Sequence, residues 1–124
     1  MIYGIGIDLI EVERIARQLI GKTHFREKIF SPNEIAYCEE KSNQAEHYAA
    51  RFAAKEALFK ALGTGWRGGL NFTEVEVLND DLGKPEFNFL GKTSQIIEEL
   101  NLTHIHLSLS HLAQIAVAVV ILEK

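Results

Sequence analysis

A long helix-forming run in the middle of the chain constrains the fold more than any other segment. Residues 45–62 are rich in alanine, and Gly63 follows the run at once. Alanine has the highest helix propensity, and a glycine directly after such a run is a common helix stop. The sequence therefore predicts one long helix over about residues 45–62.

One side of this helix combines an aromatic ring with charged groups. The residues that share it, at steps of four, four and three, are Phe52, Glu56, Lys60 and Gly63. The aromatic ring implies that this side is at least partly covered, and a carboxylate and an ammonium held there need partners. A Glu followed four residues later by a Lys also stabilises helices by roughly 0.2–0.5 kcal/mol, so the spacing fits an ordinary exposed pair as well.

Shorter elements are predicted on both sides of the long helix. An apolar run over residues 2–7 predicts a buried strand that ends at Asp8. Ser31, Pro32 and Glu34 form a helix start with a capping box, for a helix that reaches about Lys41. The other predicted elements are helices at residues 12–20 and 93–100 and strands at residues 72–78, 87–89, 104–110 and 114–122. Helices gather in the first half and hairpin-linked strands in the second, so we expect an α+β fold in one domain over residues 1–124.

Two of these elements carry further expectations. The last strand is apolar on both faces, which predicts a central or covered position in a sheet. The first helix should bury one apolar face and stop at Gly21. The residues of that face are Val12, Ile15, Ala16, Leu19 and Ile20.

Composition excludes several classes of protein. The formal net charge of −4 over 124 residues argues against general nucleic-acid binding, which depends on a basic surface. Cys38 is the only cysteine, so no disulfide can form within the chain, and its acidic neighbours disfavour a reactive thiolate. The apolar run at residues 115–122 is too short to span a bilayer. We expect a cytoplasmic protein that binds neither membranes nor nucleic acid.

A local cluster of basic residues stands out against the acidic whole. Its members are Arg14, Arg17, Lys22, Arg26 and Lys28. Such a patch can steer an acidic partner to one surface, but basic residues on a solvated helix face give the same pattern. Charge alone leaves both interpretations open.

Asp8 and Glu56 are the candidate metal ligands. Taken singly, an Asp at a strand end and a Glu in a helix are ordinary residues. Together they would form the small set of carboxylates with which Mg²⁺ is held while phosphate oxygens and water complete its coordination. The five histidines and Cys38 lack the spacing of a zinc site.

Two further segments could bind a ligand. Gly63, Thr64 and Gly65 form a turn whose backbone amides could hold a pyrophosphate, although Gly63 also suits a helix C-cap. The dinucleotide-binding and P-loop glycine patterns are both absent. His111 follows Ser110 at a strand end, but no nucleophile elbow is present, so His111 is either a ligand contact or a structural histidine.

Three ordered blocks resemble the holo-acyl-carrier-protein synthases, the short class of 4'-phosphopantetheinyl transferases. The blocks are Gly6-Ile7-Asp8 with Arg14 downstream, residues 51–65 and Ser108 to His111, and Gly83-Lys84-Pro85 resembles the family's turn before a strand. The resemblance implies an antiparallel sheet packed against a long helix. It also implies transfer of 4'-phosphopantetheine from coenzyme A to a serine of apo acyl carrier protein, in support of fatty acid biosynthesis.

The resemblance also implies roles for individual residues. Asp8 and Glu56 would hold Mg²⁺, with Lys60 as a further catalytic residue. The coenzyme site would include Arg51, Lys60, Gly63, Thr64, Gly65, Lys84 and His111, and the carrier protein would contact Arg14, Arg17 and Arg26. Larger two-repeat relatives have a second acid where this chain has Ile10, so water should complete the metal site. The family implies a homotrimer with sites between subunits.

The resemblance also implies a mechanism, in which the nucleophile belongs to the carrier protein. This chain must then position both substrates, offset charge and accept the serine proton, through Glu56 or a metal-bound water. Two other activities stay open on the residues alone. One is a metal-dependent pyrophosphatase acting on coenzyme A or a nucleotide, and the other is a coenzyme-binding module without catalysis.

Overall fold

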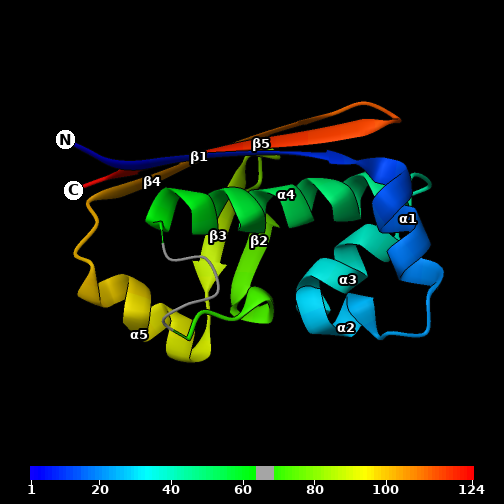
Figure 1. Cartoon of the computed structure of the whole chain (residues 1–124), viewed down its shortest axis with the longest axis horizontal. Coiled ribbons are helices and arrows are strands. Elements are labelled where there is room, and N and C mark those ends of the chain that lie inside the picture. The colour runs from blue at the N-terminus through cyan, green and yellow to red at the C-terminus, as the bar shows by residue number, and fades with distance from the viewer. Residues whose placement is uncertain (64–68) are drawn as a thin grey trace.

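The computed structural model describes residues 1–63 and 69–124 and has an α+β fold, as predicted. Helix α4 lies between a three-stranded sheet and a second layer of shorter elements (Figure 1). The helical elements are α1 (Val12–Ile20), α2 (Phe25–Ile29), α3 (Pro32–Glu39), α4 (Gln44–Leu62), the 3₁₀ turn η1 (Phe72–Glu74) and α5 (Gly91–Glu99). The strands are β1 (Ile2–Glu11), β2 (Val75–Asn79), β3 (Pro85–Phe89), β4 (His104–His111) and β5 (Ile115–Glu123).

Helix α4 is the long helix that the sequence predicts, with nearly the same bounds. Gly63 closes it in the left-handed conformation, with φ of +78°, and its N–H donates to the carbonyl of Phe59. Most of the helix is buried because layers cover it on both sides, including Lys55 and Arg51 among the apolar residues. A helix covered on two sides is the central element around which the other segments pack.

The three-stranded sheet is antiparallel in the order β1, β5, β4, so the last strand is central, as predicted. The first strand departs from expectation in two ways. It continues beyond Asp8 to Glu11, because Asp8 to Glu11 stay paired with β5, Asp8 opposite Ala118. It also is not buried on both faces: Ile5, Ile7 and Leu9 point away from α4 and are 57–66% exposed.

Two glycines let β1 approach α4 closely. A Cβ built on Gly4 would overlap the carbonyl oxygen of Ala61, and one built on Gly6 would overlap that of Ala57. At these two positions there is room only for the hydrogen atoms of glycine. The glycines of the Gly-Ile-Gly pattern are therefore needed for the close packing of β1 on α4. The exposed isoleucines alternate with these glycines, as the period of a strand requires.

The second layer follows the predicted elements with shifted boundaries, except for the short helix α2, which was not predicted. The capping box forms as expected: Ser31 Oγ accepts from the N–H of Glu34, and Glu34 accepts from the N–H of Ser31. Phe72 belongs to the 3₁₀ turn η1 and not to the strand, which begins at Val75, because Asn71 caps a tight turn through the N–H of Thr73. Ile20, predicted on the buried face of α1, is 84% exposed at the helix end, where the chain turns away at Gly21.

The two ends of the chain lie side by side (Figure 1). The N–H of Lys124 donates to the carbonyl of Met1 at 2.9 Å, and the amino group of Met1 donates to the carbonyl of Lys124 at 3.2 Å. Over the described parts of the chain, no helix combines the length and the apolar content needed to cross a bilayer.

Candidate active site

Asp8 on β1 and Lys60 on α4, both singled out from the sequence, are in direct contact. The ammonium of Lys60 donates to Oδ1 of Asp8 at 3.1 Å and to the backbone carbonyl of Ile7 at 3.0 Å. The side chain of Asp8 is 15% exposed and that of Lys60 is 55% exposed. Asp8 faces α4 because it shares the inner face of β1 with Gly6. The two residues mark a polar site where β1 passes α4.

Glu56 lies one turn before Lys60 on the same side of α4. Burial raises the pKa of the Glu56 carboxyl, and the nearby charge of Asp8 raises it further. The positive charges of Lys60 and of Arg14 on α1 act in the opposite direction. The consecutive elements β1 and α1 and the distant helix α4 thus bring two acids and two basic groups into one cluster. We call it the carboxylate site: Asp8, Arg14, Glu56 and Lys60.

The carboxylate site suits a hard divalent cation. The charge of Asp8 opposes ionisation of Glu56, and a cation between the two carboxylates would remove this repulsion. Mg²⁺ accepts one or two protein carboxylates and completes its coordination with phosphate oxygens and water. Within residues 1–63 and 69–124 no group of three or more His, Cys, Asp or Glu side chains is placed to hold a metal. The donors available to a cation in this region are therefore the Asp8 and Glu56 pair.

Arg51 projects from another side of α4 into a cleft of about 620 Å³. Its guanidinium lies 4.0 Å from the ring centroid of Tyr37, and its Nη2 donates to Oδ1 of Asn79 at 2.7 Å. Among the described residues, its buried Nε has no hydrogen-bond partner. Gly83, at the turn of the β2–β3 hairpin, lines the same cleft. The cleft thus places a cationic group beside the hairpin turn.

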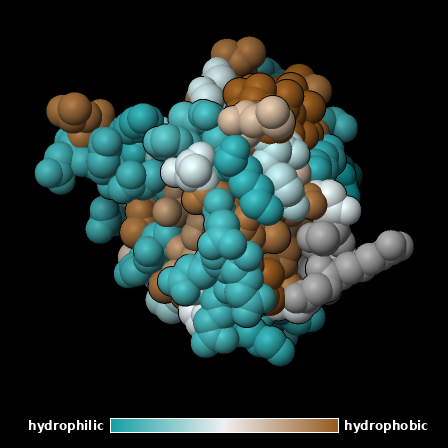
Figure 2. All heavy atoms as spheres, turned by 90° about the vertical axis from the view of Figure 1, so that its left-hand side faces the viewer, coloured by the Kyte–Doolittle hydropathy of each residue, from teal (hydrophilic) through white to brown (hydrophobic). Residues whose placement is uncertain are grey.

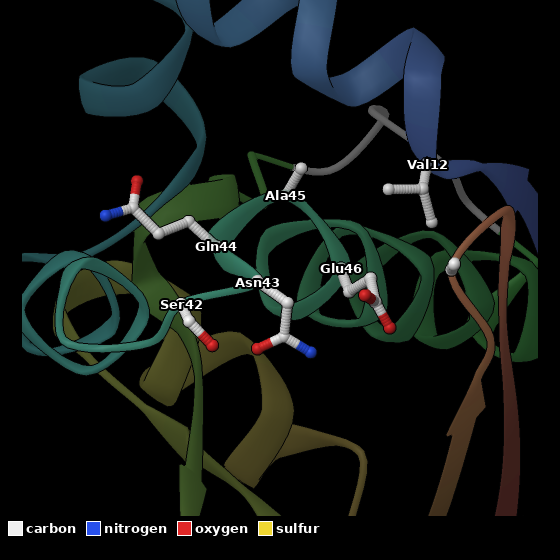
Figure 3. Close-up of a pocket in the computed structure, with 7 residues that line it drawn as sticks. Val12, Ser42, Asn43, Gln44, Ala45 and Glu46 are labelled. Carbon is white, nitrogen blue, oxygen red and sulfur yellow. The ribbon is translucent and has the colours of Figure 1, made fainter.

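His111 lies near the start of α4. Its Nδ1 is 2.9 Å from Oε1 of Glu46, and its ring stands edge-on to that of His47 at 5.3 Å. Burial lowers the pKa of His47, and the charges of His111 and Arg51 add to this effect. Glu46 also lines a pocket of about 390 Å³ that Figure 3 shows at this end of the helix, with Ser42 and Asn43 around it. His111 is therefore held by a carboxylate that itself lines this pocket.

Glu56 and Arg51 face different sides of α4. They are five positions apart, so they differ by about 140° around the helix axis, since each residue turns it by about 100°. Their partners agree: Glu56 lies near Asp8 on β1, whereas Arg51 contacts Tyr37 on α3 and Asn79 on β2. Within one chain, the predicted metal ligands and the predicted coenzyme-binding residue Arg51 are not brought together.

The other predicted site residues lie in several places. Gly63 ends α4, two turns beyond Glu56, and Thr64 and Gly65 fall outside the described residues. Lys84 is exposed at the hairpin turn, where its N–H donates to Oδ1 of Asp80 at 2.8 Å. Arg17 is exposed on α1 like Arg14. Arg26 is less available than predicted, because its Nε is 3.2 Å from the hydroxyl of Tyr48 and 3.6 Å from Oε2 of Glu39.

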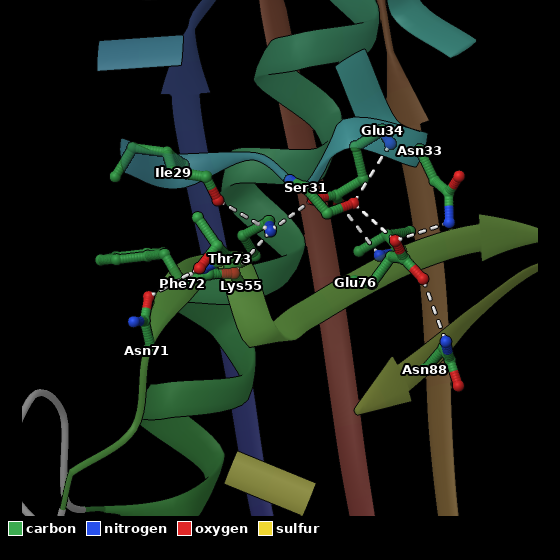
Figure 4. Close-up of polar contacts among 11 residues, drawn as sticks. Ile29, Ser31, Asn33, Glu34, Lys55, Asn71, Phe72, Thr73, Glu76 and Asn88 are labelled. Atoms are coloured by element: carbon green, nitrogen blue, oxygen red, sulfur yellow. Dashed lines mark hydrogen bonds and ion pairs between the residues drawn. The ribbon is translucent and has the colours of Figure 1, made fainter. Parts of the chain in front are cut away.

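The sequence did not reveal a buried polar network that lies on the side of α4 facing α3 and β2 (Figure 4). Its centre is the ion pair between Lys55 and Glu34, 2.7 Å long, with both side chains 0% exposed. Glu76 on β2 extends it, accepting from Ser31 at 2.6 Å and from Asn88 at 3.0 Å. A lysine inside an alanine-rich helix was the only local signal, since the three partners of its ammonium lie 17 or more positions away.

Cys38 is buried, and burial raises the pKa of its thiol to about 12. The positive charge of Arg51 opposes this shift, and the charges of Glu34 and Glu39 add to it. Burial, more than the acidic neighbours, therefore disfavours the thiolate of Cys38.

Comparison with known proteins gives one consistent result. The profile of the 4'-phosphopantetheinyl transferase superfamily matches residues 4–120. A holo-[acyl-carrier-protein] synthase of Geotalea daltonii is 46% identical over 125 residues, covering 100% of both chains. One of Koribacter versatilis is 50% identical over 125 residues, covering 99% of both.

Solved structures agree along the whole chain. The holo-[acyl-carrier-protein] synthase of Neisseria meningitidis superposes with a TM-score of 0.90 at 38% identity, covering 100% of both chains. That of Bacillus anthracis, solved in complex with CoA (3',5'-ADP), gives a TM-score of 0.82 at 41% identity and covers 100% of this chain and 98% of its own. The carboxylate site thus lies in a chain that belongs to the 4'-phosphopantetheinyl transferase superfamily, within its holo-[acyl-carrier-protein] synthase family.

Proposed function

We propose that this chain transfers 4'-phosphopantetheine from coenzyme A to a serine of apo acyl carrier protein, in a reaction that requires Mg²⁺ and leaves adenosine 3',5'-bisphosphate. The observation that carries the proposal is the carboxylate site, formed where β1 passes α4. Full-length relatives named for this activity, one of them solved with coenzyme A, support the choice of substrates. A holo carrier protein would then serve fatty acid biosynthesis.

Asp8 and Glu56 are the residues that would hold the metal. Bound there, Mg²⁺ supplies charge neutralisation at the coenzyme A pyrophosphate. The ammonium of Lys60 now lies against Asp8 and is more than half exposed, so it can turn toward an incoming phosphate. Ile10, where larger relatives have a further acid, is buried among apolar residues, which agrees with water as the remaining ligand.

Proton removal from the carrier serine falls to this same site. Either Glu56 or a metal-bound water would accept that proton. The positive charges of Lys60 and Arg14 act on Glu56 and favour its ionised form, in which it can serve as a base. Lys60 would also offset the charge that develops on the departing bisphosphate. Placing the serine in line with the scissile phosphate supplies much of the remaining acceleration.

The rest of the coenzyme would occupy the surface formed by Arg51, His111 and the Lys84 turn, with Gly63, Thr64 and Gly65 contributing backbone amides. Arg51 lines a cleft, and its Nε–H has no partner in residues 1–63 and 69–124, which suits a phosphate. Arg14 and Arg17 are exposed on α1, and the charge of Arg14 acts on Glu56. Both arginines would receive an acidic helix of the carrier protein. Arg26 would take part only at the edge of that contact.

We infer a homotrimer with sites between subunits. The outer face of the sheet pairs Ile5 with Ile121, Ile7 with Val119 and Leu9 with Val117, so apolar side chains form continuous rows. Figure 2 shows hydrophobic residues gathered over this sheet, at the top of the view. A continuous apolar face of this kind favours burial against another copy. The separation of Glu56 from Arg51 around α4 favours a site completed by a neighbouring copy.

One experiment tests the proposal. The chain is incubated with coenzyme A, Mg²⁺ and apo acyl carrier protein, and the carrier is measured by intact mass. A gain of roughly 340 Da, expected for the phosphopantetheine arm, supports the proposal when chelator abolishes it. Release of bisphosphate without carrier protein would indicate a pyrophosphatase instead. Coenzyme binding without any turnover would indicate a binding module. Cys38 is the single cysteine of the chain, and burial disfavours its thiolate. We therefore infer that the protein acts in the reducing cytoplasm.

A further inference from the structure

The Lys55 ammonium is fully satisfied inside the protein. It donates to Oε1 of Glu34 at 2.7 Å and to the backbone carbonyls of Phe72 at 2.7 Å and Ile29 at 2.9 Å. An ammonium has three donors, so these contacts use all of them. Figure 4 shows the group at the centre of segments that come from α2, α3, α4 and η1. Lys55 therefore cannot act on a substrate while this arrangement holds.

Glu34 links the Lys55 ammonium to two further elements, α3 and β2. Its Oε1 also accepts from the N–H of Ser31 at 2.9 Å, at the start of α3, and its Oε2 accepts from the N–H of Val77 at 2.9 Å, within β2. One buried carboxylate thus fixes a helix and a strand relative to α4. Removing the ammonium would leave this charge without its counter-ion in a site that water does not reach.

Both α3 and β2 also carry a residue that contacts Arg51. Tyr37 lies one turn after Glu34 on α3, and its ring centroid is 4.0 Å from the guanidinium of Arg51. Asn79 lies two residues after Val77 on β2, on the same side of the strand, and accepts from Nη2 of Arg51 at 2.7 Å. Arg51 itself lies one turn before Lys55 on α4.

We propose that the buried Lys55–Glu34 pair positions Arg51 for coenzyme binding, by holding Tyr37 and Asn79 on either side of its guanidinium. The inference rests on the proposed function, because it takes the Arg51 cleft as the place of a coenzyme phosphate. Lys55 and Glu34 are positioning residues that do not touch the substrate. A buried ion pair adds little net stability compared with apolar residues of the same size, and a role in fixing one arrangement accounts for its presence.

A double-mutant cycle tests this proposal. Lys55→Met keeps the length of the side chain and removes the charge, and Arg51→Met removes the guanidinium. The dissociation constant for coenzyme A is measured by calorimetry on the full chain, alongside transfer activity. We expect Lys55→Met to weaken binding about tenfold, the loss typical of one charged hydrogen bond. In the Arg51→Met background, the same substitution should have no further effect, because Lys55 acts through Arg51.

A stability-matched control separates positioning from general destabilisation. Val120 is buried in β5 and belongs to neither the network nor the site, so Val120→Ala should lower stability and leave coenzyme affinity unchanged. If Lys55→Met does not fold, Glu34→Gln takes its place in the cycle. Additive effects of Lys55→Met and Arg51→Met, or an equal loss in Val120→Ala, would overturn the inference. A wild-type chain that binds no coenzyme A would overturn the proposed function itself, before any variant is compared.

Discussion

The Lys60 ammonium lies 3.1 Å from Oδ1 of Asp8, so the last turn of α4 and the edge strand β1 are joined by opposite charges at the carboxylate site. The same lysine lies one turn after Glu56, the acid whose pKa burial and Asp8 raise. Lys60 thus places a positive charge beside both acids, directly against Asp8. A metal ion would compete for this place, which would free the lysine for phosphate.

Glu56→Gln should nearly abolish transfer. The amide keeps the shape of the side chain but can neither accept a proton nor hold a cation strongly. At saturating Mg²⁺ we expect turnover to fall by a factor of about 100 or more, the usual contribution of a general base. Glu13→Gln, an exposed acid on α1, is the matched control and should behave as wild type. Full turnover of Glu56→Gln would remove this residue from the chemistry.

Arg14→Ala should act mainly on capture of the carrier protein. Arg14 is exposed on α1, and its charge reaches the carboxylate site, so an acidic partner bound there would lie near Glu56. We expect a higher KM for the carrier, and a larger effect at low salt, since salt screens exposed charges. Steady-state kinetics at two ionic strengths measure this, with Lys92→Ala on α5 as the control. A lower turnover with an unchanged KM for the carrier would contradict the assigned role.

Gly6→Ala should destabilise the fold strongly. The added Cβ would overlap the carbonyl oxygen of Ala57, which is backbone and cannot move aside without shifting α4. We expect a loss of about 1–3 kcal/mol or more in the free energy of unfolding, measured with urea. Gly21→Ala is the matched control, because φ there is −73° and the nearest atom would lie at 3.4 Å. Similar stability of the two variants would show that β1 does not need its close approach.

Glu76 should contribute stability that is lost in acid. Burial raises the pKa of its carboxyl, but hydrogen bonds from Ser31, Asn88 and Asn33 outweigh this, and the pKa lies below its ordinary value of 4.5. A lowered folded pKa stabilises the protein above the unfolded pKa and ceases to do so as pH falls through the folded value.

The comparison with Glu76→Gln isolates that contribution. At pH 7 the variant should be less stable by about 1–3 kcal/mol, the cost of weakened hydrogen bonds to a buried charge. The difference from wild type should hold above pH 5 or so and shrink below about pH 4.5. Urea unfolding over this range measures it. A difference that does not change with pH would mean that the pKa of the Glu76 carboxyl is the same in the folded and the unfolded protein.

Local signals predicted the helices well. The capping box at Ser31 and Glu34 and the glycine stop at Gly63 depend on neighbours within one turn, and both formed as expected. The predicted end of the first strand was wrong, because Asp8 interrupts the apolar run but does not end the pairing of β1 with β5. Its partner Ala118 lies 110 positions later, which no local pattern reveals.

The site was predictable in its members but not in its arrangement. Asp8, Glu56 and Lys60 were named from the sequence, and the structure brings them together. The pairing of Lys55 with Glu34 was missed because a capping-box Glu already has an explanation, and its second role appears only when α3 packs on α4. The exposure of Ile5 and Leu9 likewise depends on which strand lies at the sheet edge.

The divergence of Glu56 and Arg51 around α4 has a genetic consequence if neighbouring copies share each site. A variant chain lacking only Glu56 and another lacking only Arg51 would each be inactive alone. If the two variants were mixed, unfolded and reassembled, some subunit interfaces would combine an intact Glu56 from one copy with an intact Arg51 from another. Two dead alleles expressed in one cell would then restore part of each other's activity.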